Sequence, residues 1–293
     1  MIGAGLMGHG IALELAAHDY EVRLYDRDPE QLARAGERVT ASLQLLLDSG
    51  NLSPHHVATA NRRLTLVSDL VAAVAGVDLV IEAVYEELAV KQAVFRELDA
   101  VAPERAIFAS NTSSYMPSSL AAVTRRPDRV IVTHYFNPPH LLPLVEIVPG
   151  PETAPRTVEA MCRLYESIRK NPVVLNREIP GFVGNRLQTA LLREALAIVA
   201  AGVASADDVD SIIRTGFGRR LALAGVFEVR DLSGWDVSLK VHEELLPEID
   251  SSRQVPAVLS QIAAAARGDE PTKVARRAEI TNSLAAVKRV LDG

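Results

Sequence analysis

Three glycines near the start of the chain constrain its fold more than any other feature. They have the spacing G-x-G-x-x-G, and the residues that follow have the composition of a helix. In this pattern the first glycine permits a tight turn, the second lets the backbone approach a pyrophosphate, and the third lets the helix pack on a strand. The N-terminus of that helix attracts phosphate. The pattern therefore predicts a dinucleotide-binding turn made by Gly3, Gly5, Leu6, Met7 and Gly8.

An acidic residue follows at the distance that such a site requires. The strand-like run 21–25 ends at Asp26, and a carboxylate about 20 positions after the glycines binds the ribose hydroxyls. It also repels a 2′-phosphate, so we predict NAD rather than NADP as the cofactor, although the neighbouring Arg27 weakens that preference. The alternative is that Asp26 only forms the turn that leads to Pro29.

The strand before the glycine turn is short in this sequence. Only Met1 and Ile2 precede Gly3, whereas a strand of about five residues usually stands there. A start at an internal methionine and a segment upstream of Met1 are both open interpretations. A true loss of the strand predicts weaker cofactor binding and lower stability.

Strand-like and helix-like segments alternate through the first 175 residues. The predicted helices are 29–49, 88–98 and 153–170, and the predicted strands include 64–66, 79–81, 107–109 and 173–175. Such alternation predicts an α/β fold with a mostly parallel, doubly wound sheet of the Rossmann type. We therefore predict an NAD-binding domain over residues 1–179.

The pattern after residue 179 is helical throughout. Pro180 and Gly181 mark the boundary, and helical periodicity then predicts helices at 182–201, 206–214, 237–246, 256–266 and 273–291. We therefore predict an all-helical second domain over residues 180–293.

A histidine and a glutamate stand symmetrically about a proline-rich turn. His134 follows an apolar run, Glu146 lies in a second apolar run, and His140 is the midpoint between them. In an antiparallel pair the two residues would face each other. A carboxylate fixes the tautomer of an imidazole, which suits a histidine that takes a proton from a substrate. The alternative is a buried histidine that merely pairs with a nearby acid.

These residues, with two further motifs, resemble the L-3-hydroxyacyl-CoA dehydrogenase superfamily over nearly the whole chain. The motifs are S-N-T-S-S at 110–114, H-x-F-N-P at 134–138, L-V-E at 144–146 and G-F-x-x-N-R at 181–186. The resemblance implies that His134 is the catalytic base and that Glu146 is its partner. It also implies substrate contacts from Ser113 and Asn185. Taken alone, Ser113 would suit a helix cap, and Asn185 would suit a bond to a nearby backbone carbonyl.

The resemblance extends to the nicotinamide side of the cofactor site. The family's I-E-A and E-x-x-x-x-K patterns are present at 81–83 and 86–91. They imply cofactor contacts from Ala83, Glu86 and Lys91, and the S-N-T-S-S motif implies one from Asn111. The family also implies a homodimer formed through the helical domain.

The substrate is the least constrained part of this interpretation. The chain is most similar to the lambda-crystallin, or L-gulonate 3-dehydrogenase, branch. The stretch 44–50 lacks the lysines that meet CoA phosphates in the acyl-CoA enzymes, although Ser42 matches a CoA-contacting serine and Arg62 and Arg63 could meet a phosphate. The C-terminal K-T-G-x-G-F-Y signature of the acyl-CoA enzymes is also missing, and the two departures favour a free L-3-hydroxy acid over its CoA thioester.

Two other classes of function are open at this point. A dehydrogenase with a lysine base is disfavoured, because no lysine begins the helical domain. A non-catalytic NAD-binding protein of the lambda-crystallin kind is the second alternative.

The single cysteine, the absence of a long apolar run and the net charge of −6 predict a cytoplasmic protein that binds neither membrane nor nucleic acid. The histidine spacing predicts no metal site.

Overall fold

The computed structural model describes residues 1–260 and 270–291. The chain divides into two compact units, Met1–Phe182 with Val274–Gly293, and Val183–Lys273. None of the helices in these described ranges is long and apolar enough to cross a membrane. The two units are treated separately below.

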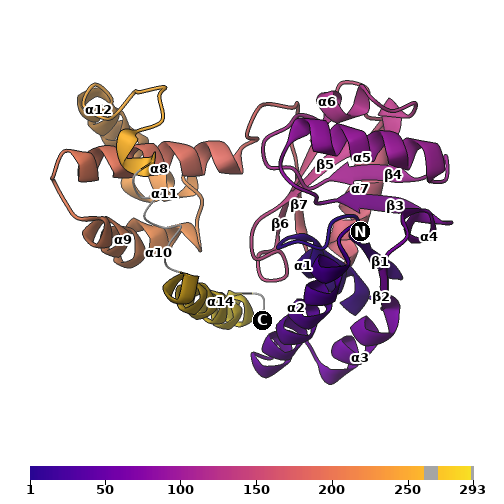
Figure 1. Ribbon diagram of the computed structural model, residues 1–293. Helices are drawn as coiled ribbons and strands as arrows, with labels where there is room; N and C mark the ends of the chain where they lie inside the picture. Colours follow the sequence, from indigo (N-terminus) through magenta and orange to yellow (C-terminus); the bar gives the residue numbers. More distant parts are fainter. Residues whose placement is uncertain (261–269, 292–293) are drawn as a thin grey trace. The chain divides into compact units, whose positions relative to one another are not determined.

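The first unit is built on a mostly parallel sheet (Figure 1). A parallel pair consists of β1 (Val22–Tyr25) and β2 (Leu64–Val67). Five further strands pair in chain order: β3 (Leu79–Glu82), β4 (Ile107–Ser110), β5 (Val130–Tyr135), β6 (Leu144–Pro149) and β7 (Asn171–Val174). Only β5 and β6 run antiparallel. The α/β, mostly parallel, Rossmann-type fold predicted from the sequence is therefore confirmed.

Helices cover both faces of this sheet because its strands are apolar on both sides. One core contains Ile81, Ala109 and Ile131, and the other contains Val80, Phe108 and Val130, as the two-residue period of a strand requires. The first core also holds residues of α1 (Gly8–Ala17), α2 (Pro29–Asp48), α3 (Pro54–Arg63) and α7 (Pro155–Ser167). The second holds residues of α4 (Leu70–Val74), α5 (Leu88–Val101) and α6 (Pro117–Ala121). The 3-10 turn η1 (Pro127–Arg129) leads into β5.

Helix α2 shows how local sequence sets these elements. Asp28 caps it by accepting a hydrogen bond from the Glu30 backbone N–H, and Pro29 occupies its first turn, as is favourable at a helix start. Its buried side chains recur at helical spacing, at Leu32, Ala35, Val39, Leu43 and Leu46. The helix predicted over 29–49 is therefore confirmed with nearly the same bounds.

The second unit contains only helices in its described part. They are α8 (Gly184–Ala200), α9 (Ala206–Thr215), α10 (Phe217–Leu221), α11 (Glu228–Ser233) and α12 (Trp235–Leu245). The predicted all-helical second domain is confirmed in character. The helix predicted over 256–266 falls largely outside the described residues.

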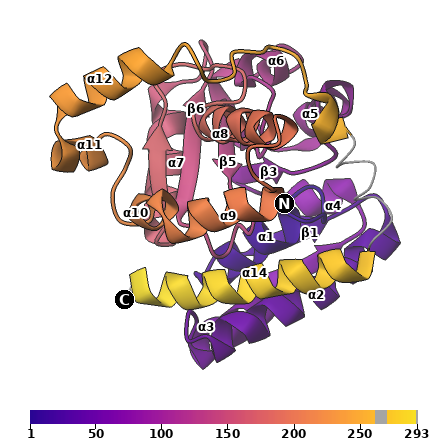
Figure 2. The same cartoon turned by 90° about the vertical axis from the view of Figure 1, so that its left-hand side faces the viewer.

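The last helix, α14 (Glu270–Leu291), groups with the first unit from Val274 onward. Figure 2 shows it running over α2 and α3. Ala285 is buried in the first core, and the Asn51 side chain donates a hydrogen bond of 2.8 Å to the Ala285 carbonyl. The last helix therefore packs on the nucleotide-binding unit from Val274 onward, although it follows the helical unit in the sequence.

Candidate active site

The glycine turn leads from Ile2 into α1 at the carboxyl end of the sheet, and its shape fits a pyrophosphate. Gly3 has φ +94°, and a Cβ there would lie 2.6 Å from the Ala83 carbonyl oxygen. A Cβ on Gly8 would lie 1.8 Å from the Gly3 carbonyl oxygen, so both positions require glycine. A Cβ on Gly5 would meet nothing within 4 Å. The turn is therefore tight where it touches protein and open where a phosphate would approach. Leu6, beside Gly5, has an exposed side chain.

Asp26 lies at the end of β1 beside this turn. One carboxylate oxygen accepts a 2.8 Å hydrogen bond from the Ala4 backbone N–H, and the other accepts one of 3.0 Å from Asp28. Arg38 on α2 donates a 2.6 Å hydrogen bond to the Ala4 carbonyl. Sequence reasoning missed Arg38, since no motif marks its position. Asp26 is thus held beside the glycine turn by two backbone N–H groups, which is the position of the ribose-binding carboxylate in the Rossmann pattern.

Replacing Asp26 with alanine should weaken NAD binding by roughly tenfold or more, because a charged hydrogen-bond acceptor contributes about 1.5–3 kcal/mol. The gap between NAD and NADP should narrow, since the negative charge that repels a 2′-phosphate is gone. Titrating both cofactors into the Asp26→Ala protein measures each effect. Asp28→Asn, which keeps a capping side chain, is the matched control, and an unaltered cofactor preference would contradict the ribose assignment.

Glu86 connects the S-N-T-S-S motif to this edge of the sheet. One oxygen of its carboxylate accepts hydrogen bonds from the Thr112 hydroxyl at 2.6 Å and from the Ser113 backbone at 2.9 Å, and the Ser113 hydroxyl lies 3.3 Å away. Burial raises the pKa of Glu86, but the Thr112 hydrogen bond and the Lys91 charge outweigh it and lower the pKa overall. Helix α6 has Met116 as its N-cap, so the interpretation of Ser113 as a helix cap is wrong.

Behind Glu86 lies a buried ion pair. The ammonium of Lys91 contacts the Glu82 carboxylate at 2.8 Å and the Glu86 carboxylate at 3.0 Å, and Lys91 and Glu82 are both about 1% exposed at the side chain. Ser110 donates a 2.6 Å hydrogen bond to the second oxygen of Glu82. Lys91 therefore reaches the site through Glu86. The Asn111 side-chain oxygen accepts a hydrogen bond from the Tyr135 backbone, which ties the ends of β4 and β5 together.

His134 and Glu146 meet across the antiparallel pair, as predicted. The register sets His134 opposite Glu146, and Nδ1 of the imidazole lies 2.7 Å from the carboxylate. Both side chains are buried, and the rings of Phe136 and Phe182 flank the imidazole at 4.8 and 5.6 Å between centroids. With Nδ1–H donated to Glu146, Nε2 carries the lone pair that can accept a proton.

The turn between these strands buries a second histidine. His140 is 5% exposed, and neither ring nitrogen has a hydrogen-bond partner within the described residues. A Cβ on Gly10 of α1 would lie 3.0 Å from its Nδ1. Burial, with the nearby charges of His9, Lys170 and Lys288, lowers the pKa of His140 to about 4. His140 is therefore a neutral packing group between α1 and the β5–β6 turn.

The depressed pKa of His140 predicts a stability that depends on pH. Between its ordinary value of 6.5 and about 4, the unfolded chain binds a proton that the folded protein does not, so stability is full above pH 6.5 and is lost as the pH falls. Thermal unfolding of His140→Leu should show a shallower fall over this range, with the exposed His55→Leu as control. Parallel curves for His140→Leu and the unaltered protein would contradict the assignment.

Asn185 is the second residue of α8 and belongs to the helical unit. The other predicted site residues all lie in the first unit. They fall into three groups: the glycine turn with Asp26, the set of Ala83, Glu86, Lys91, Asn111 and Ser113, and the His134–Glu146 pair. All three groups lie at the carboxyl ends of parallel strands or in the β5–β6 pair, where an open α/β sheet binds its ligands.

Comparison with known proteins identifies the family of this chain. Residues 1–179 match the family model of the 3-hydroxyacyl-CoA dehydrogenase NAD-binding domain, and residues 181–274 match that of its C-terminal domain. A Rossmann-type domain with a glycine-rich turn, followed by a helical domain, is typical of NAD-dependent dehydrogenases. The chain belongs to the 3-hydroxyacyl-CoA dehydrogenase family, and NAD is its cofactor.

Several relatives align over most of the chain. The 5-formyl-3-hydroxy-2-methylpyridine 4-carboxylate 5-dehydrogenase of Mesorhizobium japonicum is 35% identical and covers 100% of this chain and 97% of its own. The lambda-crystallin of Oryctolagus cuniculus is 37% identical over 80% of this chain and 73% of its own. The L-carnitine dehydrogenase of M. japonicum is 36% identical over 82% and 65%. The crystal structure of an NAD⁺-dependent 5-formyl-3-hydroxy-2-methylpyridine 4-carboxylic acid 5-dehydrogenase has a TM-score of 0.93 at 32% identity, covering 100% and 97% of the two chains.

Proposed function

We propose that this protein oxidises the 3-hydroxy group of a free L-3-hydroxy acid to the 3-keto group. The observation that carries the proposal is the buried His134–Glu146 pair, with Nδ1 engaged at 2.7 Å and Nε2 left to accept a proton. NAD supplies the hydride acceptor when it is bound.

His134 is the base in the proposed reaction. An alcohol proton is too weakly acidic to leave unaided at neutral pH, so Nε2 takes it as the hydride leaves the carbinol carbon. Glu146 holds the imidazole in the required tautomer and stabilises the imidazolium that forms, as the carboxylate of a catalytic triad does. The carbinol loses one hydride and one proton, which leaves the ketone.

Ser113 positions the substrate in this proposal. Its backbone and hydroxyl are fixed by Glu86, which is itself fixed by Thr112 and Lys91. A hydroxyl held in this way offers a defined hydrogen bond to the substrate oxygen. Asn185 is proposed to bind the carboxyl group, because it matches the substrate-binding asparagine of the family.

A free acid suits the surface charges better than a CoA thioester does. Arg63 forms ion pairs with Asp19 and Glu21, and Arg62 donates to Thr59, so neither guanidinium is reserved for a phosphate. The last turn of helix α2, which ends at Asp48, contains no basic residue that could meet a CoA phosphate. Two of the relatives are named for dehydrogenating small carboxylates, a pyridine carboxylate and L-carnitine.

NADH formation tests the substrate class directly. The panel contains L-gulonate, L-carnitine, L-3-hydroxybutyrate and L-3-hydroxybutyryl-CoA, each at equal concentration with NAD. We expect kcat/KM to be highest for a free acid. Turnover of the thioester alone would identify a strict acyl-CoA dehydrogenase. Cofactor binding with no turnover of any compound would favour the non-catalytic alternative.

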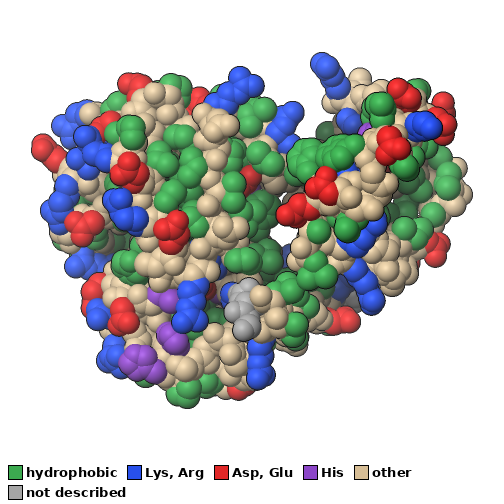
Figure 3. Space-filling view, turned by 180° about the vertical axis from the view of Figure 1, so that it is seen from behind, with side chains coloured by type: hydrophobic (Ala, Val, Ile, Leu, Met, Phe, Trp, Pro, Cys, Tyr) green, Lys and Arg blue, Asp and Glu red, His purple; other side chains and the backbone are tan. Residues whose placement is uncertain are grey.

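We also propose that the helical unit forms a homodimer. Within its described residues only Leu196, Val229 and Ser238 are buried, while large apolar side chains such as Leu223, Phe227 and Leu232 are more than 70% exposed. Figure 3 shows hydrophobic side chains, in green, on the visible face of this unit. So much exposed apolar surface is typical of an interface. Sedimentation at micromolar concentration should give twice the chain mass, and a monomer would refute the proposal.

A further inference from the structure

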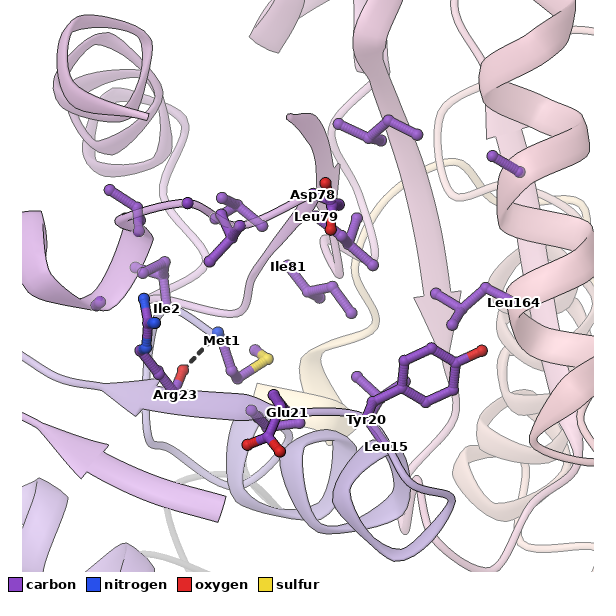
Figure 4. A pocket seen from close by; sticks show the side chains of 18 of the residues that line it. Met1, Ile2, Leu15, Tyr20, Glu21, Arg23, Asp78, Leu79, Ile81 and Leu164 are labelled. Carbon is purple, nitrogen blue, oxygen red and sulfur yellow. Dashed lines mark hydrogen bonds between the residues drawn. The ribbon is translucent and has the colours of Figure 1, made fainter. Parts of the chain in front are cut away.

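The first part of the glycine turn is held by backbone contacts. Figure 4 shows the Met1 nitrogen donating a hydrogen bond to the Arg23 carbonyl of β1, at 2.8 Å. The Gly3 N–H donates to the Tyr25 carbonyl, also at 2.8 Å. The Gly3 carbonyl then faces α1, because a Cβ on Gly8 would lie 1.8 Å from its oxygen. As far as Gly3, the spacing of the glycines explains the path of the chain.

The next two carbonyls of the turn are held by side chains instead. The Arg38 guanidinium on α2 donates a 2.6 Å hydrogen bond to the Ala4 carbonyl. Nδ1 of the His9 ring, at the start of α1, lies 2.9 Å from the Gly5 carbonyl. A carbonyl only accepts hydrogen bonds, so Nδ1 of His9 carries the proton. Neither Arg38 nor His9 belongs to the G-x-G-x-x-G spacing, and each of them turns one carbonyl into the protein.

Each of these two hydrogen bonds also sets the direction of the N–H group that follows. In a planar trans peptide, the C=O and the next N–H point in opposite directions. The Gly5 N–H therefore points away from Arg38, and the Leu6 N–H points away from His9. Among the described residues neither N–H has a hydrogen-bond partner, and a Cβ on Gly5 would meet nothing within 4 Å. Two adjacent N–H groups at an open position are suited to bind an anion.

Burial and charge suit both side chains to this role. The His9 side chain is buried. Burial, with the charge of Arg38, lowers the pKa of His9 further than the Gly5 hydrogen bond raises it, so the ring is neutral at pH 7 and holds one N–H. Arg38 keeps its charge, and a charged donor forms a stronger hydrogen bond than a neutral one. The buried Nε of Arg38 has no hydrogen-bond partner within the described chain, so the Ala4 carbonyl is what orients this guanidinium.

We propose that Arg38 and His9 are positioning residues for the pyrophosphate of the cofactor. They hold two carbonyl groups, whose negative ends would repel a phosphate, against the protein. The N–H groups of the same two peptides are then left to donate to phosphate oxygens. Neither side chain has to touch the cofactor to act in this way. Asp26 sets which nucleotide the turn prefers, whereas Arg38 and His9 set how tightly the turn binds the phosphates.

The test measures NAD binding by isothermal titration in Arg38→Met and in its matched control, Arg34→Met. Arg34 lies on the same helix with its side chain 63% exposed, and both variants remove one positive charge. The Kd for NAD should rise about tenfold in Arg38→Met, since a charged hydrogen bond is lost, and less than about twofold in Arg34→Met. The Kd for NADP should rise by the same factor as that for NAD, because Asp26 is intact. Arg38→Lys, which keeps a charged donor, should recover affinity.

Two further measurements separate a role at the turn from a general loss of structure. His9→Phe keeps a buried ring but loses the donor, and it should raise the Kd for NAD about threefold, the effect of one neutral hydrogen bond. In the unaltered protein, the NMR signal of the Gly5 amide proton should move downfield when NAD binds. In Arg38→Met this shift should fall by at least about half, because the N–H is no longer aimed at the phosphate.

Three outcomes would overturn the proposal. The first is an unaltered NAD affinity in a folded Arg38→Met protein. The second is an equal loss in Arg34→Met, which would reduce the effect to net charge. The third is a larger loss for NADP than for NAD, which would mean that the guanidinium touches the nucleotide itself. If Arg38→Met does not fold, Arg38→Lys and His9→Phe decide by the same Kd values. These measurements need no substrate, so they are independent of the proposed reaction.

Discussion

The protein with His134 replaced by glutamine should lose roughly 10²–10⁴ of its kcat, the range that general base catalysis supplies. Glutamine is close to histidine in size and can still hydrogen-bond to Glu146, but it cannot take a proton. The hydroxyl proton of the substrate would then have no acceptor beside the carbon that loses hydride. Initial rates of NADH formation at saturating substrate measure the loss.

Cofactor affinity separates this chemical role from a structural one. The glycine turn and Asp26 lie beside β1, whereas His134 lies on β5, so the Kd for NAD should stay within about twofold of the unaltered value. His55→Gln, at an exposed position, is the matched control for rate. An unchanged kcat in His134→Gln would remove the residue from its role, and a large loss of NAD affinity would instead show that the pair supports the fold.

The β5–β6 pair could be predicted because local and long-range signals agree there. Two apolar runs flank a turn rich in proline, and the turn places its midpoint at His140. Only an antiparallel pairing joins two strands through so short a connection, so the register of His134 and Glu146 followed. The glycine turn was equally readable, because Gly3 and Gly8 each have a steric reason that the structure confirms, and Gly5 leaves the turn open.

Helices with weak apolar periodicity were not predicted. Helix α3 buries only Thr59 and Ala60 and is fixed instead by Pro54 in its first turn and by a capping box between Ser53 and His56. Helix α4 has five residues and depends on the Asp69 side chain at its start. Periodicity needs a longer apolar stripe than either helix offers. Capping residues were the available signal.

Contacts between residues far apart in the sequence could not be predicted either. The pattern of α14 gives a helix but does not say which unit it packs against, and its contact through Asn51 joins residues 234 positions apart. The contact of Arg38 with the glycine turn and the ion pairs of Lys91 with its carboxylate partners were also not predicted. They form only when the strands and helices come together. Buried polar networks of this kind are satisfied by tertiary contacts.

Replacing Lys91 with methionine should reduce the free energy of unfolding by about 3–5 kcal/mol, the loss expected when one member of a buried ion pair is removed. Methionine keeps the length of the side chain but leaves the Glu82 carboxylate, about 1% exposed, without its cation. The bonds that Glu82 accepts from the Val84 backbone and the Ser110 hydroxyl remain, but they do not neutralise its charge. Urea unfolding at pH 7 measures the loss.

The double variant Lys91→Met with Glu82→Gln distinguishes an uncompensated charge from lost packing. Glutamine removes the buried charge and still accepts a hydrogen bond, so the double variant should recover at least half of the stability that the single variant loses. A surface substitution, Lys240→Met, should change stability by less than about 0.5 kcal/mol. A double variant no more stable than Lys91→Met would show that the loss comes from packing. The charge of the Lys91–Glu82 pair would then not be what keeps Lys91, and through it Glu86, in place.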